Sequence, residues 1–319
     1  MPRPLLFLAL LLFVPTLSLA TLVSLGGPGQ PEPLSSVSRP FADLDLSDLP
    51  APQQYRARDG AQLSYAAYPA ARSLASVVLI HGSSANLRSL HPLARHLRDA
   101  GYSVYSLDVR GHGESGERGH IAYIGQLEDD LDDFLTQVNP AGPRLLVGFS
   151  AGGGFALRYA TSSRQKNFAG YLLLAPFVHH EAPNARPDSG GWVSVGLPRI
   201  IGLAALNGLG IEQYNRLPVM HFAVSAEDAR RLTPDYDYNL TFNFRGPERY
   251  PDDLRALRQP TAVVAGSADE IFVSEALDEI FSASPQPVPV TLVPQLDHVG
   301  LTLAPSGHAA ITRALGQLH

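Results

Sequence analysis

Between residues 76 and 318 the chain alternates short apolar runs with longer stretches of helical spacing. The apolar runs, each predicted to be a buried β-strand, are 76–80, 102–107, 144–147, 171–174, 261–265 and 288–293. The stretches between them that are predicted to be α-helices are 87–99, 124–138, 152–160, 274–282 and 304–318. Strands that alternate with helices form a mostly parallel sheet covered by helices on both faces. The sequence therefore predicts an α/β fold.

The alternation is interrupted between residues 175 and 261, an interval far longer than an ordinary connection. We interpret its larger part, at about 179–258, as a cap inserted into a single domain that covers 53–319. Aromatic residues gather in this cap: Trp192, Tyr214, Phe222, Tyr236, Tyr238, Phe242, Phe244 and Tyr250. They form either the roof of an apolar pocket or a small core of the cap itself, and the sequence leaves both readings open.

Composition supports one sizeable core, because 45% of the 319 residues are hydrophobic. The formal net charge is -6, and the chain lacks the basic excess that binding to nucleic acid requires. We therefore expect no nucleic acid partner. Cysteine is absent, which excludes disulfides, thiolate metal sites and a cysteine nucleophile.

Residues 1–25 predict either a signal peptide or a signal anchor. Arg3 precedes an apolar run from Leu5 to Val14, a length that suits the core of a signal peptide, and the small residues around Ala20 favour cleavage after it. Apolar residues resume at 21–25, so an uncleaved segment is long enough to anchor the chain in a membrane. A buried N-terminal helix is disfavoured, because no polar face breaks the run.

Both favoured readings of the N-terminus place the following domain outside the cytoplasm, as a periplasmic, secreted or membrane-anchored protein. The next segment, 26–52, is rich in proline, glycine and serine and predicts a linker.

The pentapeptide Gly148-Phe149-Ser150-Ala151-Gly152 follows a predicted strand and precedes a predicted helix. A serine on such a sharp strand-to-helix turn is exposed for attack, and its glycine neighbours let adjacent chain approach closely. This context predicts Ser150 as a nucleophile. A helix start made of small residues without reactivity is the alternative interpretation.

A serine hydroxyl becomes a good nucleophile when a histidine takes its proton. His298 follows the last predicted strand, at the sheet edge where the Ser150 turn is expected, and we predict it to be the base. His308 lies within the last predicted helix and His319 at the chain end, so neither is well placed. His179 and His180 are expected on the surface or in the cap, and no third metal ligand is evident beside them.

The base needs a carboxylate that orients its imidazole and stabilises the charged form. Asp269 follows the strand 261–265, which gives the chain order serine, acid, histidine. Asp269 is therefore the predicted acid. Glu270 and Asp297 are alternatives, and a helix-capping role is the structural alternative for Asp269.

Acyl transfer also requires donors directed at the developing oxyanion. The loop Ile80-His81-Gly82-Ser83-Ser84 ends the first strong strand, and the backbone amides of Ser83 and Ala151 are the predicted donors. His81 is predicted to brace this loop.

Together these residues resemble the branch of the α/β-hydrolase superfamily that contains monoglyceride lipases, lysophospholipases and serine aminopeptidases. The motif Asp108-Val109-Arg110-Gly111-His112-Gly113-Glu114-Ser115-Gly116 carries the resemblance further, as do residues 118–120 and 130–131. The resemblance implies the α/β-hydrolase fold with an inserted cap. The serine turn lacks the histidine and methionine that monoglyceride lipases carry around it, so the resemblance extends to the reaction type and not to monoglycerides.

The predicted function is hydrolysis of a carboxylic ester, lipidic or of medium chain length, through an acyl-enzyme on Ser150 and without a metal or organic cofactor. Two alternatives remain open. One is a serine peptidase of the same branch, whose cap would grip a substrate amine through acidic residues, for which Glu181, Glu212, Glu227 and Asp228 are available. The other is a non-catalytic binding protein of the cell envelope on the same fold. Oligomeric state is left open.

Overall fold

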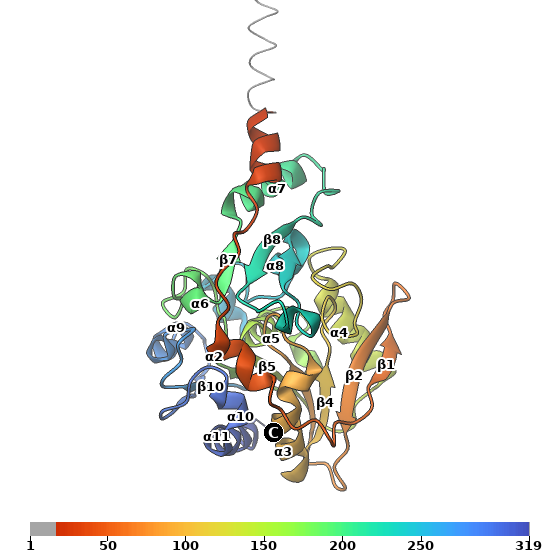
Figure 1. Ribbon diagram of the computed structural model, residues 1–319. Coiled ribbons are helices and arrows are strands. Elements are labelled where there is room, and N and C mark those ends of the chain that lie inside the picture. The colour runs from red at the N-terminus through yellow and green to blue at the C-terminus, as the bar shows by residue number, and fades with distance from the viewer. Residues whose placement is uncertain (1–16, 319) are drawn as a thin grey trace, which may run out of the picture.

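The computed structural model describes residues 17–318, and its centre is an eight-stranded sheet (Figure 1). The strands are β1 (Gln53–Arg56), β2 (Gln62–Tyr68), β3 (Ser76–Ile80), β4 (Ser103–Leu107), β5 (Arg144–Phe149), β6 (Gly170–Leu174), β10 (Thr261–Gly266) and β11 (Val290–Val293). Their order across the sheet is β1-β2-β4-β3-β5-β6-β10-β11. The pairs β1–β2 and β2–β4 are antiparallel, and all other pairs are parallel.

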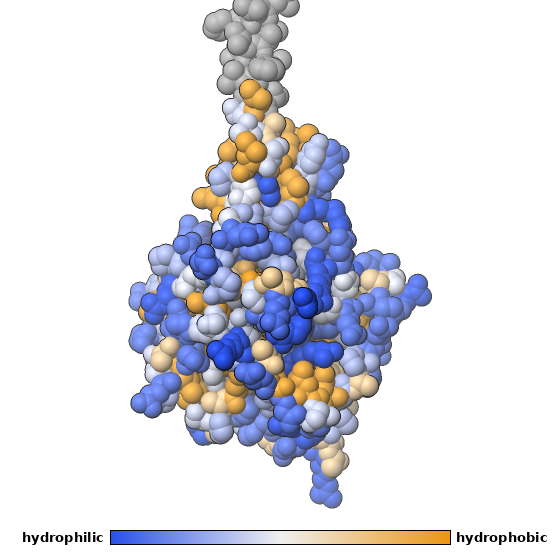
Figure 2. Space-filling model, in the orientation of Figure 1, coloured by the Kyte–Doolittle hydropathy of each residue, from blue (hydrophilic) through white to orange (hydrophobic). Residues whose placement is uncertain are grey.

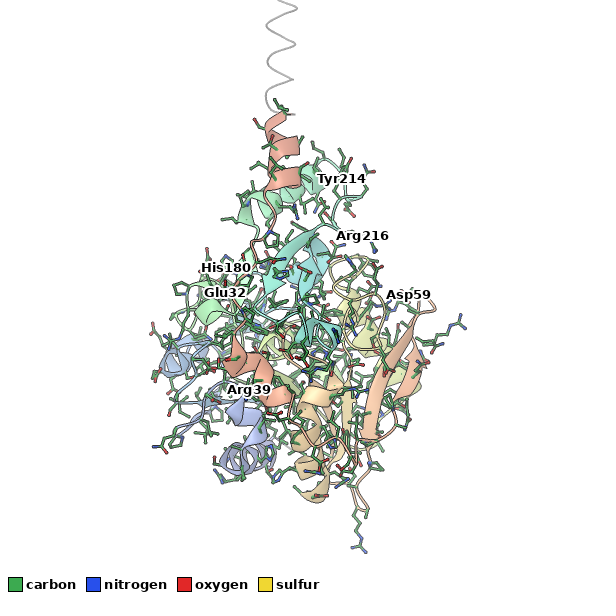
Figure 3. All side chains as sticks on the ribbon, viewed as in Figure 1. Glu32, Arg39, Asp59, His180, Tyr214 and Arg216 are labelled. Atoms are coloured by element: carbon green, nitrogen blue, oxygen red, sulfur yellow. The ribbon has the colours of Figure 1, made fainter. Side chains whose placement is uncertain are left out.

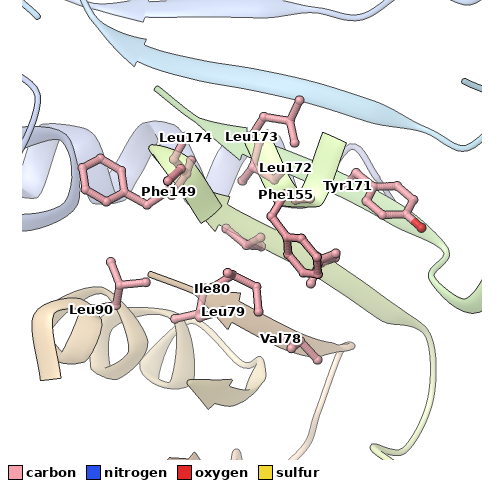
Figure 4. Packing of buried hydrophobic residues seen from close by; sticks show 14 of the residues in the cluster. Val78, Leu79, Ile80, Leu90, Phe149, Phe155, Tyr171, Leu172, Leu173 and Leu174 are labelled. Carbon is pink, nitrogen blue, oxygen red and sulfur yellow. The ribbon is translucent and has the colours of Figure 1, made fainter. Parts of the chain in front are cut away.

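Strands β3, β5, β6 and β10 are buried along almost their whole length, which accounts for their continuous apolar sequences. The two sets of helices that bury them are α3 (His91–Asp99), α10 (Gly300–Leu303) and α11 (Pro305–Leu315) on one side, and α4 (Gln126–Gln137) and α5 (Ala151–Ala160) on the other. Figure 4 shows part of this core, with Leu90 and Phe155 packed against residues of β3, β5 and β6. The predicted α/β class is thus confirmed.

Shorter elements complete the large domain. They are the helix α9 (Leu277–Phe281) and the 3-10 helices η2 (Leu87–Leu90), η3 (Gln165–Asn167) and η6 (Ser274–Ala276). An ion pair between Arg158 Nε and Glu128 Oε1, at 2.6 Å, joins α5 to α4.

The chain between β6 and β10 forms a separate layer, the predicted cap. Its elements are α6 (Asp188–Gly191), β7 (Val193–Val195), α7 (Leu197–Gly208), β8 (Pro218–Phe222), η4 (Asp228–Arg230), β9 (Asp235–Asp237), α8 (Tyr238–Asn243) and η5 (Asp252–Ala256). Strands β7, β8 and β9 make a small antiparallel sheet of their own. Figure 1 shows β7, β8 and α7 between the large sheet and the N-terminal helix.

Most of the aromatic residues of the cap belong to one of two hydrophobic clusters. Trp192, Phe222, Tyr236 and Phe244 are buried in the main core and so attach the cap to the large domain. Tyr238 and Phe242 belong to a small second cluster. Tyr238 and Phe242 thus match the reading of a small core within the cap, whereas the other four aromatics join the cap to the large domain.

The N-terminal residues lie against the cap. Residues 17–25 are helical, and the side chain of Val23 is buried against α7. The guanidinium group of Arg199 donates to the carbonyls of Val23, at 2.8 Å, and Ser24, at 3.1 Å, and so satisfies the end of this helix. None of the helices within residues 17–318 has the length and hydropathy needed to cross a membrane. Most of the predicted signal segment, residues 1–16, lies outside the described residues.

The segment 26–52, predicted as a linker, follows the surface of the cap and the large domain. It contains α2 (Ser35–Ser38) and the 3-10 helix η1 (Arg39–Phe41). The amide of Leu34 donates to the carbonyl of Ala223 at 2.8 Å, and Val37 is buried in the main core. The segment is packed onto the protein over part of its length.

Candidate active site

The register of the sheet brings five loops to one edge. Ile80 pairs with Gly148, Phe149 with Leu174, and Gly266 with Val293, so that β3, β5, β6, β10 and β11 end near the same level. The carboxyl ends of parallel strands are where open α/β sheets place their ligand sites. The loops after these strands carry all the residues that the sequence singles out: Ser83, Ser150, Ala151, Asp269 and His298.

Ser150 occupies the turn between β5 and α5 in a strained backbone conformation, with φ 57° and ψ -119°. Hydrogen bonds hold this turn, because the Ser150 amide donates to the Leu174 carbonyl at 2.9 Å and the Ser150 carbonyl accepts from the amide of Gly154 at 3.0 Å. A Cβ atom at position 148 would lie 2.0 Å from the carbonyl oxygen of Gly152. The tight turn therefore requires glycine there, as the pentapeptide predicts.

His298 and Asp269 form a buried hydrogen-bonded pair. The imidazole Nδ1 lies 2.8 Å from Asp269 Oδ2, and the side chains are 4% and 0% exposed. The other carboxylate oxygen accepts from the amides of Ile271 and Phe272, each at 2.8 Å. The carboxylate is thus fixed by three donors, and an imidazole that donates through Nδ1 leaves Nε2 unprotonated and able to act as a base.

The ring of His298 packs beside the serine turn. Its centroid lies 4.8 Å from that of Phe149, which directly precedes Ser150, and 5.3 Å from that of Phe272. Aromatic contact on two sides restricts the orientation of the imidazole. The structure therefore brings His298, Asp269 and the Ser150 turn together.

The two alternative acids have other partners. Glu270 Oε2 accepts from the backbone amide of His298 at 3.0 Å, and Asp297 Oδ1 accepts from the amide of Gly300 at 2.6 Å. Both carboxylates therefore bond to the backbone of the loop around His298, and Asp269 alone of the three bonds to the imidazole.

The loop after β3 touches the serine turn. A Cβ at Gly82 would lie 3.2 Å from Ser150 Cβ, and one at Gly152 would lie 2.3 Å from the His81 carbonyl oxygen. Within residues 17–318, the backbone amides of Ser83 and Ala151 have no hydrogen-bond acceptor. Two unpaired amides beside a nucleophile candidate fit the predicted oxyanion donors.

His81 is buried, and burial lowers its pKa to about 4, so its imidazole is neutral near pH 7. Its Nδ1 lies 2.8 Å from the Gly82 carbonyl oxygen, and its Nε2 accepts from the Val109 amide at 3.2 Å. Both ring nitrogens are engaged by backbone, as expected of a residue that braces the loop.

Two of the cap aromatics contact this loop, a role that the sequence does not predict. Trp192 Nε1 donates to Ser83 Oγ at 3.0 Å, and the hydroxyl of Tyr236 accepts from the Ser84 amide at 2.7 Å. Apart from their aromatic character, nothing in the local sequence predicts that these residues contact the loop after β3. The contacts join positions more than one hundred residues apart.

The remaining candidates do not join the site. Ligand atoms of His179, His180 and Glu181 lie within 4.8 Å of one another, but these are consecutive residues of one turn and only His179 is buried. Figure 3 shows His180 at the periphery of the molecule. Of the acids weighed for binding an amine, Glu181, Glu212 and Glu227 are exposed, and Asp228 pairs with Arg231.

A family model described as serine aminopeptidase, S33, matches residues 71–301, which include the serine turn, Asp269 and His298. The chain belongs to this family. It lies in the monoglyceride lipase-like branch of the α/β-hydrolases, as the resemblance implies.

Among curated relatives, the monoacylglycerol lipase of Mycolicibacterium smegmatis is 38% identical over 109 residues, which cover 32% of this chain. The alignment spans 38% of the length of that relative.

Solved structures share the fold over more of the chain. A soluble variant of monoglyceride lipase from Saccharomyces cerevisiae, in complex with a substrate analog, superimposes with a TM-score of 0.65 and 19% identity over 85% of this chain and 95% of its own. A membrane phospholipase A superimposes with a TM-score of 0.59 and 18% identity over 100% of this chain and 99% of its own. At these identities the similarity establishes the α/β-hydrolase fold.

Proposed function

We propose that this protein is a serine hydrolase that cleaves carboxylic esters with lipidic or medium-chain acyl groups. The observation that carries the proposal is the buried bond between His298 Nδ1 and Asp269 Oδ2 beside the strained turn that holds Ser150. Such a pair has a clear chemical use, because it holds a neutral imidazole in the tautomer that can accept a proton from serine.

The proposed reaction has two steps. Ser150 Oγ attacks the ester carbonyl while His298 Nε2 takes its proton, and the resulting oxyanion accepts hydrogen bonds from the amides of Ser83 and Ala151. His298 returns the proton to the departing alcohol as the carbon–oxygen bond of the ester breaks. Water then attacks the acyl-enzyme with His298 as base, and release of the acid restores Ser150. Asp269 stabilises the imidazolium in both steps.

The proposed substrate class rests on the relatives and on the cap. The relative from Mycolicibacterium smegmatis is a monoacylglycerol lipase, and similarity to it favours an ester over an amide. The peptidase alternative requires an acid that meets a substrate amine, and the four acids considered for this role are exposed or paired with arginine. The binding-protein alternative is disfavoured because all three triad positions are filled.

A test of this class compares p-nitrophenyl esters of increasing acyl length with aminoacyl amides, using the full chain. We expect turnover of esters, with kcat/KM greatest at medium or long acyl length, and turnover of amides at least about a hundredfold slower. Preferential cleavage of aminoacyl amides would instead favour the peptidase, and no turnover of either class would favour the binding protein.

We also propose that the protein is exported and faces a membrane through the end of the cap. Large hydrophobic side chains that are exposed gather at this end, on the N-terminal helix, on β7 and α7 and on the loop after α7: Leu17, Leu25, Val195, Leu197, Ile201, Leu209, Ile211 and Tyr214. Figure 2 shows the same hydrophobic end of the molecule, and Tyr214 is labelled there in Figure 3.

An apolar surface of this kind suits the interface of a bilayer. Residues 5–14 add a further apolar run to the sequence. A lipid substrate would be reached from the same side.

A further inference from the structure

A buried polar network between the cap and the loop after β3 has no part in the mechanism above. Its members are His81, Ser84, His112 and Tyr236, with exposures of 0%, 1%, 0% and 2%. Buried polar groups are costly unless paired, so the bonds made by the two imidazoles, the Tyr236 hydroxyl and the Ser84 amide fix the geometry of the backbone they hold. The Ser84 hydroxyl takes no part, since it has no partner within residues 17–318. The backbone in question is the one that carries the Ser83 amide.

The cap holds this loop through four hydrogen bonds. Besides the bonds from Trp192 to Ser83 and from Ser84 to Tyr236, the amide of Thr233 donates to the Ser84 carbonyl at 2.8 Å, and Asn86 Nδ2 donates to the Arg231 carbonyl at 2.9 Å. Ser84 itself has a φ of 65°, a conformation that non-glycine residues adopt at a cost. The bonds from the cap stabilise that conformation.

The partners determine where each proton lies. His112 Nδ1 faces the carbonyl oxygens of Val109 and Arg110, both at 3.3 Å, so Nδ1 carries the hydrogen and Nε2 accepts. The hydroxyl of Tyr236 donates to that Nε2 and accepts from the Ser84 amide. Burial holds the pKa of His112 well below its ordinary value, so the imidazole stays neutral and this direction is fixed.

The peptide between Gly82 and Ser83 is held on both sides. A peptide unit is planar, and its carbonyl and N–H point in opposite directions. His81 Nδ1 binds the Gly82 carbonyl, so it fixes the direction of the Ser83 N–H in the same plane. Tyr236 fixes the next amide, that of Ser84, and Trp192 fixes the Ser83 side chain.

We infer that Tyr236 of the cap is a positioning residue for the oxyanion donor, and that Trp192 supports it. The cap then contributes to the rate, because the donor amide keeps its orientation only while the cap holds the loop. This inference rests on the proposed function, in which the Ser83 amide binds the oxyanion.

The test uses the full chain and Tyr236→Phe, which retains the ring that packs on Phe222 and removes only the hydroxyl. We expect kcat for a soluble short-chain ester to fall about tenfold to a hundredfold, with KM changed by less than about twofold. The Ki of a trifluoromethyl ketone, which forms an oxyanion with the serine, should rise by the factor by which kcat/KM falls. A structural defect that left the oxyanion donors in place would not raise the Ki by the factor by which kcat/KM falls.

Tyr238→Phe is the matched control. It removes a hydroxyl that lies elsewhere in the same cap, in its small second cluster, and should leave kcat and Ki unchanged. Wild-type kcat in Tyr236→Phe, an unchanged Ki, or equal losses in both variants would overturn the inference.

If Tyr236→Phe does not fold, the variants Trp192→Phe and Ser83→Ala test the inference instead. Each removes the hydrogen bond from Trp192 Nε1 to Ser83 Oγ and leaves the Ser83 amide in place. Non-additive losses of kcat in the double variant support the inference, and wild-type kcat in both single variants overturns it. A separate result would contradict the proposed function itself, namely ester turnover retained by Ser150→Ala. The inference alone fails if turnover depends on Ser150 and not on the network.

Discussion

At the scale of single residues, chain order and strand position proved informative about the candidate site. The position after β10 and the chain order serine, acid, histidine favour Asp269 over Glu270 and Asp297, and Asp269 is the carboxylate that bonds to His298. The two other acids brace the same loop, which is why composition alone could not separate the three. The hydrogen bond to the imidazole distinguishes Asp269 from its neighbour Glu270.

Asp269→Asn tests this assignment. The amide keeps the shape of the carboxylate but favours the wrong tautomer of the imidazole and cannot stabilise its charged form, so kcat should fall by about 10⁴ with the protein still folded. Asp297→Asn changes a neighbouring acid that bonds only to the Gly300 amide and should keep kcat within about threefold. Steady-state ester hydrolysis checks both, and equal losses would contradict the assignment.

At the scale of elements, the strands β3, β4, β5, β6, β10 and β11 were predicted, since each lies in a mainly apolar run of the sequence. Strands β1 and β2 were not predicted. β1 is mostly exposed at the sheet edge, and β2 consists largely of small and polar residues that are buried by antiparallel pairing with β4. Such burial depends on partners distant in sequence, which local pattern does not reveal.

The junction of β5 and α5 gives a prediction about stability. Gly148→Ala places a Cβ against backbone at the serine turn, so it should lower the free energy of unfolding by about 3 kcal/mol or prevent folding. Gly208→Ala, near the end of α7, meets no atom within 4 Å and should be neutral or raise stability by up to about 1 kcal/mol. Urea denaturation of both variants measures the difference, and a stable Gly148→Ala with full activity would contradict the turn geometry.

At the scale of the whole molecule, the catalytic sheet and the apolar surface lie at opposite ends of one axis. The sheet with its site lies below the cap, and the cap ends in the apolar surface that carries the N-terminal helix (Figures 1 and 2). The sequence indicated both an inserted cap and an apolar N-terminus. It did not reveal that the two pack together, because Val23, Arg199 and Gly202 meet across almost two hundred residues of chain.

The apolar end predicts binding to lipid. The full chain should cosediment with phosphatidylcholine vesicles, and Ile201→Glu combined with Leu209→Glu should weaken that binding at least about tenfold, since both side chains are more than half exposed and their loss removes apolar area from the contact. Leu74→Glu, at an exposed position in the large domain, is the control and should bind as the wild type does. Equal binding by all three proteins would argue against this surface.

The most direct measurement is the site of covalent attachment of an alkyl fluorophosphonate to the full chain, located by peptide mass spectrometry and followed by ester hydrolysis. We expect one adduct, on Ser150, with turnover lost in proportion to labelling and absent from Ser150→Ala. An adduct on another residue, or ester hydrolysis by Ser150→Ala at the wild-type rate, would contradict it.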